Sequence, residues 1–533
     1  MTKTIDVKSE PKELTENKQN NMKTETKTTK GKSKENLDND DKTKRNNDNN
    51  NNNTTDQTLI DSKKKPLSQD IKSDAKTTTT NDTKNTDQTS DVQKHYNRDV
   101  WFVTSSSAKA KIASRTKQLE KISAEILANP DVAHEEKEIH RYLCGLLAKL
   151  DCTVHSSYIH PTAFKAEFKP NSKTNVTVGL ICEYDAVKGF GHSKGNNLST
   201  EATIATFLGI REAMKADSRL LGTVIILGTP ASEESSGKIR MLKEGAFNDM
   251  DALFAVHPSN YDSLCPKFYC SQKIRVNFFG ISRHIDCLNV SPGENACEAS
   301  VLCYTNALAL SAQVQPRCQI HCIIKRCGDV DYLVPKKTEL VFSVRAPTLH
   351  ELDSINKRIV DCGEAAALAT RTRVEFHFPD DDMHCSVNHN SVLAKVFKDE
   401  AKKLGITFKT NTTTAANNND NDSDIIYRTT DLGNVSHKVP LIYPAFAIGC
   451  PEAADTYVHS RQFSTAVAKV DAQKYTIKAA TALAMTVIRY LLDDSIRQNA
   501  KKLFDSDFQA LNKCLIKTVE QKVVNNTDKK NEK

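Results

Sequence analysis

Three short apolar runs alternate with helix-like segments, and this alternation constrains the fold more than any other feature of the chain. The runs are Val176–Cys182, Gly222–Leu227 and Ala252–Val256, and the first two are rich in β-branched residues. The segments between them, Leu198–Lys215 and Lys238–Glu244, place apolar residues three and four positions apart, as a helix requires. Strands that are apolar on both faces are typical of parallel or mixed sheets covered by helices on both sides. The sequence therefore predicts an α/β fold with a mixed or parallel sheet.

Residues 272–385 follow a different order, in which two strand–helix–strand units follow each other directly. This β-α-β-β-α-β order predicts a split βαβ sandwich, that is, an α+β domain inserted into the first domain. Its predicted elements are the strand Lys273–Phe279, the helix Ala296–Ala312, the strands Ile320–Lys325 and Glu339–Val344, the helix Leu349–Ala369 and the strand Arg373–Phe378.

The segments on either side of the insertion complete the first domain, which we predict to consist of residues 97–271 and 386–505. The same patterns predict four further helices, one further strand and an exposed Asn-rich loop. They are the helices Ser105–Ala128, Ala133–Leu150, Val392–Leu404 and Ala466–Leu492, the strand Pro444–Ile448 and the loop Asn411–Asp424.

The two ends of the chain have the composition of disordered tails. Residues 1–95 are dominated by Lys, Thr, Asn, Asp and Ser, with only about a dozen scattered apolar side chains to bury. Such a segment cannot offset the entropy of ordering it, so we predict a disordered, polar, low-complexity tail. Residues 506–533 are Lys-rich, and we predict a second polar tail there.

Charge and cysteine content narrow the class of protein. A net charge of +7 over 533 residues is modest, and no basic stripe or nucleic-acid-binding motif occurs, so we expect no nucleic-acid partner. No apolar run approaches the about 18 residues of a membrane span, and no apolar signal segment is present, so we expect a cytoplasmic protein with no membrane contact. The 15 Cys residues form no regular framework, which favours reduced thiols. The group Cys318, His321, Cys322 and Cys327 lacks zinc-like spacing and is better explained as part of a half-buried strand.

The loops that follow the predicted strands carry most of the reactive side chains. Each loop alone has an ordinary structural explanation, such as a tight turn or a solvated carboxylate. Together, acidic and imidazole groups at several strand ends suit a metal ion that polarises an amide carbonyl and its attacking water. The loops are Glu183–Asp185, Gly189–Leu198, Thr229–Glu234, Val256–Pro258, Thr429–Ser436 and Tyr457–Ser460.

Several sequence blocks within these loops resemble one known family. The blocks CEYDA (182–186), GHxxGxNL (191–198), VxxLGTPA (224–231), VHP (256–258) and TDxGNVS (430–436) occur in the family's order. On these blocks the chain resembles the amidohydrolase subgroup of peptidase family M20, in its Xaa-Arg dipeptidase branch. The resemblance implies a dinuclear metallohydrolase domain with an inserted lid, residues 272–385, that forms a homodimer. It also implies a dipeptide or N-acyl amino acid as substrate.

The chain departs from the family pattern at several ligand positions. The family has Cys and His two residues apart in the first loop, where this chain has Lys194 and Asn196. An ammonium has no free lone pair, and an amide is a poor ligand for zinc. The family's next pair, a general-base Glu and a ligand Glu, falls on Ser232 and Glu233 in strict register. A shift of one residue would place the pair on Glu233 and Glu234 instead.

The remaining family positions give the expected site. By resemblance, Glu233, His257 and His459 would bind zinc or manganese, and Glu233 or Glu234 would transfer the proton. The lid residue His284 would reach across the dimer to stabilise the oxyanion. The substrate loop would contain Asp431, Gly433 and Asn434.

Because ligands and the base are substituted, two functions stay open. One is an amide hydrolase of weak or lost activity. The other is a dimeric non-catalytic homologue (a pseudoenzyme) that binds a peptide or a partner and holds no metal. For Lys194 we expect either an ion pair with Glu233 in place of a metal or a side chain that points into solvent.

Overall fold

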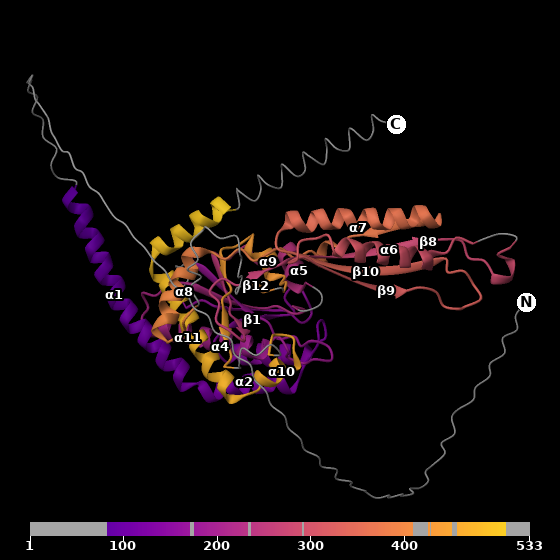
Figure 1. Cartoon of the computed structure of the whole chain (residues 1–533). Coiled ribbons are helices and arrows are strands. Elements are labelled where there is room, and N and C mark those ends of the chain that lie inside the picture. The colour runs from indigo at the N-terminus through magenta and orange to yellow at the C-terminus, as the bar shows by residue number, and fades with distance from the viewer. Residues whose placement is uncertain are drawn as a thin grey trace, which may run out of the picture. The chain divides into compact units, whose positions relative to one another are not determined.

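The structure is a computed structural model that describes residues 83–170, 175–232, 236–289, 293–408, 425–426, 428–449 and 456–507 (Figure 1). Side chains are described from residue 97 onward, except at 380, 425 and 426. Three sequence predictions lie outside these ranges: the polar segment as far as residue 82, the Asn-rich loop and the tail after residue 507. The residues Glu233 and Glu234 also lie outside them.

A mixed six-stranded sheet forms the centre of the first domain. The strand order is β1-β2-β4-β3-β5-β13. Strands β3, β4, β5 and β13 pair in parallel, whereas β1 and β2 are antiparallel to their neighbours. The strands are β1 (Thr153–Ser156), β2 (Phe164–Phe168), β3 (Thr177–Cys182), β4 (Thr223–Gly228), β5 (Ala252–Phe254) and β13 (Leu441–Ile442). The predicted α/β class with a mixed sheet is confirmed.

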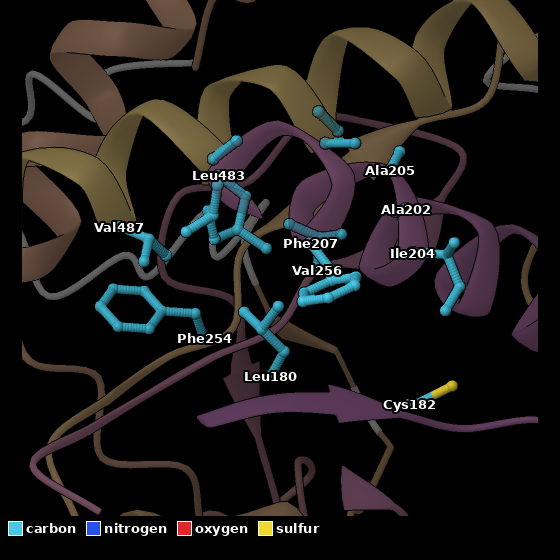
Figure 2. Close-up of a cluster of buried hydrophobic side chains, with 14 of the residues drawn as sticks. Leu180, Cys182, Ala202, Ile204, Ala205, Phe207, Phe254, Val256, Leu483 and Val487 are labelled. Atoms are coloured by element: carbon cyan, nitrogen blue, oxygen red, sulfur yellow. The ribbon is translucent and has the colours of Figure 1, made fainter. Parts of the chain in front are cut away.

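Several helices cover one face of this sheet. Helix α4 packs against α1, α2 and α11, and α11 also packs against α8. Figure 2 shows Phe207 of α4 and Leu483 of α11 directed at Leu180 and Phe254 of the sheet, and all four side chains are buried. The helices of this layer are α1 (Thr83–Ser114), α2 (Thr116–Ala128), α3 (Lys137–Ala148), α4 (Asn196–Ala216), α8 (Ser391–Lys403) and α11 (Val470–Leu492).

The opposite face of the sheet is covered by two short helices, α5 (Gly237–Lys243) and α9 (Leu432–Ser436). Successive side chains of a strand point to opposite faces, so Ile181 joins this second core while Leu180 joins the first. The apolar runs seen in the sequence are thus explained by strands that are buried on both faces.

Short strand pairs extend the sheet's carboxyl edge. Strands β6 (His257–Ser259) and β14 (Ala445–Ala447) pair in parallel, as do β7 (Lys267–Phe268) and β12 (Ile425–Ile426). Helix α10 (Arg461–Ala466) precedes α11. These pairs bring segments from the two halves of the first domain together around the loops that follow β3, β4 and β5.

The inserted segment forms a four-stranded antiparallel sheet of order β11-β8-β10-β9, with α6 and α7 packed on it (Figure 1). Its elements confirm the predicted β-α-β-β-α-β order. They are β8 (Cys270–Phe279), α6 (Ala296–Ser311), β9 (Gln319–Arg326), β10 (Lys337–Ala346), α7 (Leu349–Thr370) and β11 (Arg373–His377). Its apolar side chains form a core of their own, separate from the two cores of the first domain. The boundary residues of the two domains stay predictions.

Two local expectations need correction. The helix predicted at Ser105–Ala128 is two helices, and the first begins at Thr83, inside the segment that composition assigned to the tail. Cys297 and Cys327 form a disulfide that ties the start of α6 to the end of β9, so the expectation of reduced thiols is wrong for this pair. Cys322 lies on β9, as the strand explanation predicts, whereas Cys318 lies just before it; both are free thiols. Among the described helices, none has the length and apolar character to cross a membrane.

Candidate functional site

The reactive loops meet at the carboxyl edge of the parallel strands. Glu183 and Asp185 follow β3, Ser232 follows β4, and His257 opens β6 shortly after β5. Because these strands are parallel and adjacent, the loops that follow them lie at the same edge of the sheet. The structure brings six polar residues into contact there, and we call them the site cluster. They are Glu183, Asp185, Lys194, Ser232, Lys238 and Asp431, all of them buried.

Lys238 joins two buried carboxylates in the centre of the cluster. Its Nζ lies 2.5 Å from Oε1 of Glu183 and 2.8 Å from Oδ1 of Asp431, and its side chain is completely buried. The backbone N–H of Lys238 also donates to Oδ2 of Asp431 at 2.9 Å. Burial alone would lower the pKa of Lys238, but Asp431 and Glu183 raise it, so the ammonium stays charged.

Lys194 supplies the second ammonium of the cluster. Only 7% of the residue is exposed, so the expectation that it points into solvent is wrong. Its Nζ donates to Oγ of Ser232 at 3.1 Å and lies 3.5 Å from Oε2 of Glu183. Burial alone would raise the pKa of Glu183, but the charges of Lys194 and Lys238 hold it at about 2. Lys194 thus forms an ion pair with Glu183, whereas the pair that we predicted, with Glu233, lies outside the described residues.

Ser232 and Asn196 connect this ammonium to Asp185. The Ser232 hydroxyl donates to Oδ1 of Asp185 at 2.6 Å. Nδ2 of Asn196 donates to the backbone oxygen of Asp185 at 2.8 Å and lies 3.2 Å from its Oδ1. The amide at position 196 thus acts as a hydrogen-bond donor to a carboxylate.

Gly195 explains how Lys194 and Asn196 both point into the cluster. It caps α4 with φ of +85°, a left-handed conformation that side chains disfavour. A Cβ at this position would also lie about 3 Å from the Pro258 ring. The sharp turn and close packing fix the loop against the strand that carries His257.

His257 is buried and surrounded by hydrogen-bonding partners. Nη1 of Arg428 lies 3.1 Å from its Nε2, and the Tyr443 hydroxyl lies 3.3 Å from its Nδ1. The same hydroxyl donates to Oε2 of Glu183 at 3.3 Å. Because a guanidinium can only donate, we assign the ring proton to Nδ1. Burial, and then the charges of Arg428 and Lys194, lower the pKa of His257 well below its usual value, so the ring is neutral.

The other two predicted histidines, His459 and His284, lie outside the site cluster. His459 adopts a left-handed conformation, and its backbone N–H donates to the oxygen of Ser193 at 2.8 Å, beside the Lys194 loop. His284 lies in the inserted domain, where it is half exposed and contacts Asp286 and Tyr332 of the same domain. Its predicted role across a dimer is not tested by these contacts.

The predicted substrate-loop residues have clear structural contacts. Asn434 accepts from the Cys385 N–H at 3.0 Å and donates to the Met383 oxygen at 2.9 Å. A Cβ at Gly433 would lie 1.9 Å from the Cys385 oxygen, so only glycine fits there. Both residues fix α9 against the segment that leaves the inserted domain, and Asp431 binds Lys238.

Sequence reasoning missed five members of this arrangement, and one of them, Lys238, was recognised only as the start of a helix. Glu183 and Asp185 were recognised only as part of a strand-end loop, although a buried strand followed at once by two carboxylates was a usable signal. No local pattern marked Arg428 or Tyr443, since each becomes important only through its contact with His257.

The described residues do not fit a dinuclear metal centre. Within the described ranges, no group of three or more His, Cys, Asp or Glu side chains is arranged to hold a metal ion. Two ammonium groups and a guanidinium lie among the carboxylates and the imidazole instead. Lys194 and Lys238 both lie beside the carboxylate of Glu183, Lys238 also contacts that of Asp431, and Arg428 contacts the imidazole of His257.

Comparison with known proteins places this arrangement in context. The chain is 33% identical over 411 residues to Xaa-Arg dipeptidase from Mus musculus. The matched region covers 75% of this chain and 92% of the relative. The human Xaa-Arg dipeptidase gives the same identity and covers 75% of this chain and 91% of the relative. An aminobenzoyl-glutamate utilization protein from Klebsiella pneumoniae shares the fold, with a TM-score of 0.51 at 14% identity over 72% of this chain and 96% of that one. No family model matches the chain.

Proposed function

Since this chain belongs to peptidase family M20 and resembles the Xaa-Arg dipeptidases, we propose that it binds a dipeptide or N-acyl amino acid but has weak or lost hydrolytic activity. The binding half of the proposal rests on the activity named for the relatives. The loss of hydrolysis rests on the residues of the site cluster.

One observation carries the loss of activity: Ser232 stands between Lys194 and Asp185 in the cluster. In strict register, Ser232 takes the place of the family's general base. Its contacts support that register, because its hydroxyl lies among the residues that follow β3. The Ser232 hydroxyl donates to Asp185 and accepts from both Lys194 and Asn196, so its proton and both of its lone pairs are engaged and it cannot take a proton from water.

The direct test is an assay of the purified full-length chain. We expect no turnover of a panel of dipeptides and N-acyl amino acids, with zinc or manganese added, above the rate without protein. The triple variant Lys194→Cys, Asn196→His, Ser232→Glu should gain metal-dependent turnover. A wild-type kcat/KM of about 10⁴ M⁻¹ s⁻¹ or more, as ordinary enzymes have, would contradict the loss of activity.

The binding half has its own test. A dipeptide or N-acyl amino acid that binds the folded chain should raise its Tm in proportion to the logarithm of ligand concentration. If no member of the panel shifts Tm at millimolar concentration, the cleft does not bind this class of ligand.

A second candidate is a hydrolase that uses a single zinc or manganese ion on Glu233, His257 and His459. His459 lies near enough to His257 to influence its pKa, which favours this alternative. The Arg428 guanidinium opposes it, because it occupies Nε2 of His257, one of the two ring nitrogens through which a histidine binds a metal. Metal analysis separates the two: one bound ion per chain favours the hydrolase.

We also propose that the inserted domain forms a homodimer, as the resemblance implies. Strand β9 is the edge of its sheet, and Ile323 and Ile324 on that strand are exposed, as is Leu308 on α6. An apolar edge strand is a surface that pairs readily with a second copy. Light scattering of the full chain should give twice the protomer mass. The variant Ile323→Lys should lower this measured mass, whereas the matched control Val470→Lys on α11 should leave it unchanged. A monomer at micromolar concentration would exclude the dimer and the role of His284.

A further inference from the structure

The cations of the site cluster indicate a function for Lys194 itself, beyond the loss of a metal ligand at its position. We propose that its ammonium is a built-in replacement for a metal ion, which balances the buried carboxylates so that the chain folds and stays folded without metal. This inference builds on the proposed function in that both start from the residue at 194, but it concerns stability and not turnover.

Glu183 lies beside more than one positive charge. This buried carboxylate has two ammonium neighbours, Lys194 at 3.5 Å and Lys238 at 2.5 Å. Lys238 is shared with Asp431, which is completely buried. Without Lys194, one ammonium would face two buried carboxylates, and an unbalanced buried charge is strongly unfavourable.

Lys194 also begins a chain of hydrogen bonds that leads to Asp185. Its ammonium donates to Ser232, whose hydroxyl in turn donates to Asp185. Asn196 donates to the same carboxylate from the other side of Gly195. Residues 194 and 196 therefore act as donors toward oxygen atoms, which is the opposite of what two metal ligands would do. A lysine ammonium, with three donors and a point charge, is suited to this position.

The imidazole of His257 also contacts a cation. Arg428 donates to Nε2 of His257, while the other ring nitrogen faces Tyr443. A divalent ion entering the cluster would meet Lys194, Lys238 and Arg428, all of like charge. The arrangement thus opposes metal binding through charge.

The first experiment measures stability against metal. Full-length wild-type protein, purified and then treated with chelator, should keep its Tm, and stoichiometric zinc or manganese should shift Tm by less than about 1 °C. The double variant Lys194→Cys, Asn196→His should bind zinc and gain several degrees from it, since a metal that binds only the folded state stabilises it. A gain of several degrees by the wild type with stoichiometric zinc would overturn the proposal.

The second experiment separates charge balance from packing. Lys194→Met should lower Tm by several degrees, whereas Lys188→Met, an exposed lysine in the same loop, should leave it unchanged. Adding Glu183→Gln to Lys194→Met removes the unbalanced carboxylate and should recover part of the loss. If Lys194→Met is as stable as Lys188→Met, or if the double variant is no better than the single one, Lys194 does not balance the site.

These outcomes are distinct from those of the activity assay. Turnover by chelator-treated wild type would contradict the proposed loss of hydrolysis and leave the function of Lys194 intact. Stabilisation of the wild type by zinc without turnover would contradict the proposed function of Lys194 and leave the proposed loss of hydrolysis intact.

Discussion

Two buried glutamates of the same domain have opposite electrostatic environments. Glu183, at the end of β3, contacts two ammonium groups, and its pKa is about 2. Glu201, in the second turn of α4, faces the Ser123 hydroxyl, with the like charge of Glu120 near by; burial raises its pKa to about 8. Burial opposes ionisation at both positions, so the difference comes from the cations. At the carboxyl edge of the sheet, the carboxylate of Glu183 is therefore stabilised by neighbouring ammonium groups. In the helical layer, the carboxyl group of Glu201 is more stable when neutral.

The largest expected effect comes from removing the shared ammonium of the site. Lys238→Met leaves Glu183 and Asp431 buried together with one cation fewer, and we expect a loss of about 3–5 kcal/mol in the free energy of unfolding. Lys243→Met, on the same helix but in an exposed pair with Asp381, should cost less than about 1 kcal/mol. Urea denaturation of both variants measures the difference, and equal losses would contradict the contrast between buried and exposed pairs.

Glu183→Gln tests the site side of the comparison. The folded-state pKa of about 2 lies below the usual value of 4.5, so the ionised carboxylate stabilises the fold. This contribution is present above pH 4.5 and is lost as the pH falls toward 2; it amounts to about 3 kcal/mol at neutral pH. The stability gap between wild type and variant should therefore shrink between pH 5 and pH 3. A gap that is constant over this range would show that the charge of Glu183 is not the source.

Glu201→Gln tests the other side and should act in the opposite direction. The raised pKa means that the folded chain holds the proton more tightly than the unfolded chain, so the contribution of Glu201 is full below pH 4.5 and is lost as the pH rises toward 8. At pH 7 the variant should gain up to about 2–3 kcal/mol. The matched variant Glu244→Gln, on the surface, should show no gain. Denaturation curves at pH 5 and pH 8 provide the measurement, and a Glu201→Gln variant that is less stable than wild type at pH 8 would refute the prediction.

The smallest effect concerns the hydroxyl that links the imidazole to the carboxylate. Tyr443→Phe removes the bonds to Glu183 and His257 but keeps the ring, which stacks on Phe268. Each bond is long at 3.3 Å, so we expect a cost of about 1 kcal/mol. A loss as large as that of Lys238→Met would mean that the hydroxyl, and not the ammonium groups, holds the site together.

The two domains were predictable from sequence because their signals are local. The strands β3, β4 and β5 and the helix α4 lie within a few residues of their predicted positions, since buried strands and amphipathic helices leave a pattern in the chain itself. Strand β1 was missed because its four residues are largely exposed and carry no alternation. The disulfide between Cys297 and Cys327 was missed because spacing alone does not define a pairing.

The site could be predicted only in part. The loops and the substituted positions Lys194 and Asn196 were identified from their place in the sequence blocks. The partner of Lys194 could not be predicted, because Glu183 and Glu233 both follow strands of the same predicted sheet. The sequence does not say which of the two carboxylates lies beside the ammonium. Glu183 is the described partner, at 3.5 Å. Arg428 and Tyr443 come from segments far along the chain from His257, and no local pattern connects them to it.

The sequence by itself determined the α/β class, the inserted domain and the family, because hydrophobic period and short motifs are properties of neighbouring residues. Tertiary structure alone decided which charges balance. Whether an ammonium replaces a metal, or a carboxyl group binds a proton at neutral pH, depends on burial and on groups brought together from distant segments. The fold alone brings three cations to the edge where the strands of one sheet end, next to Glu183 and His257: Lys194, Lys238 and Arg428.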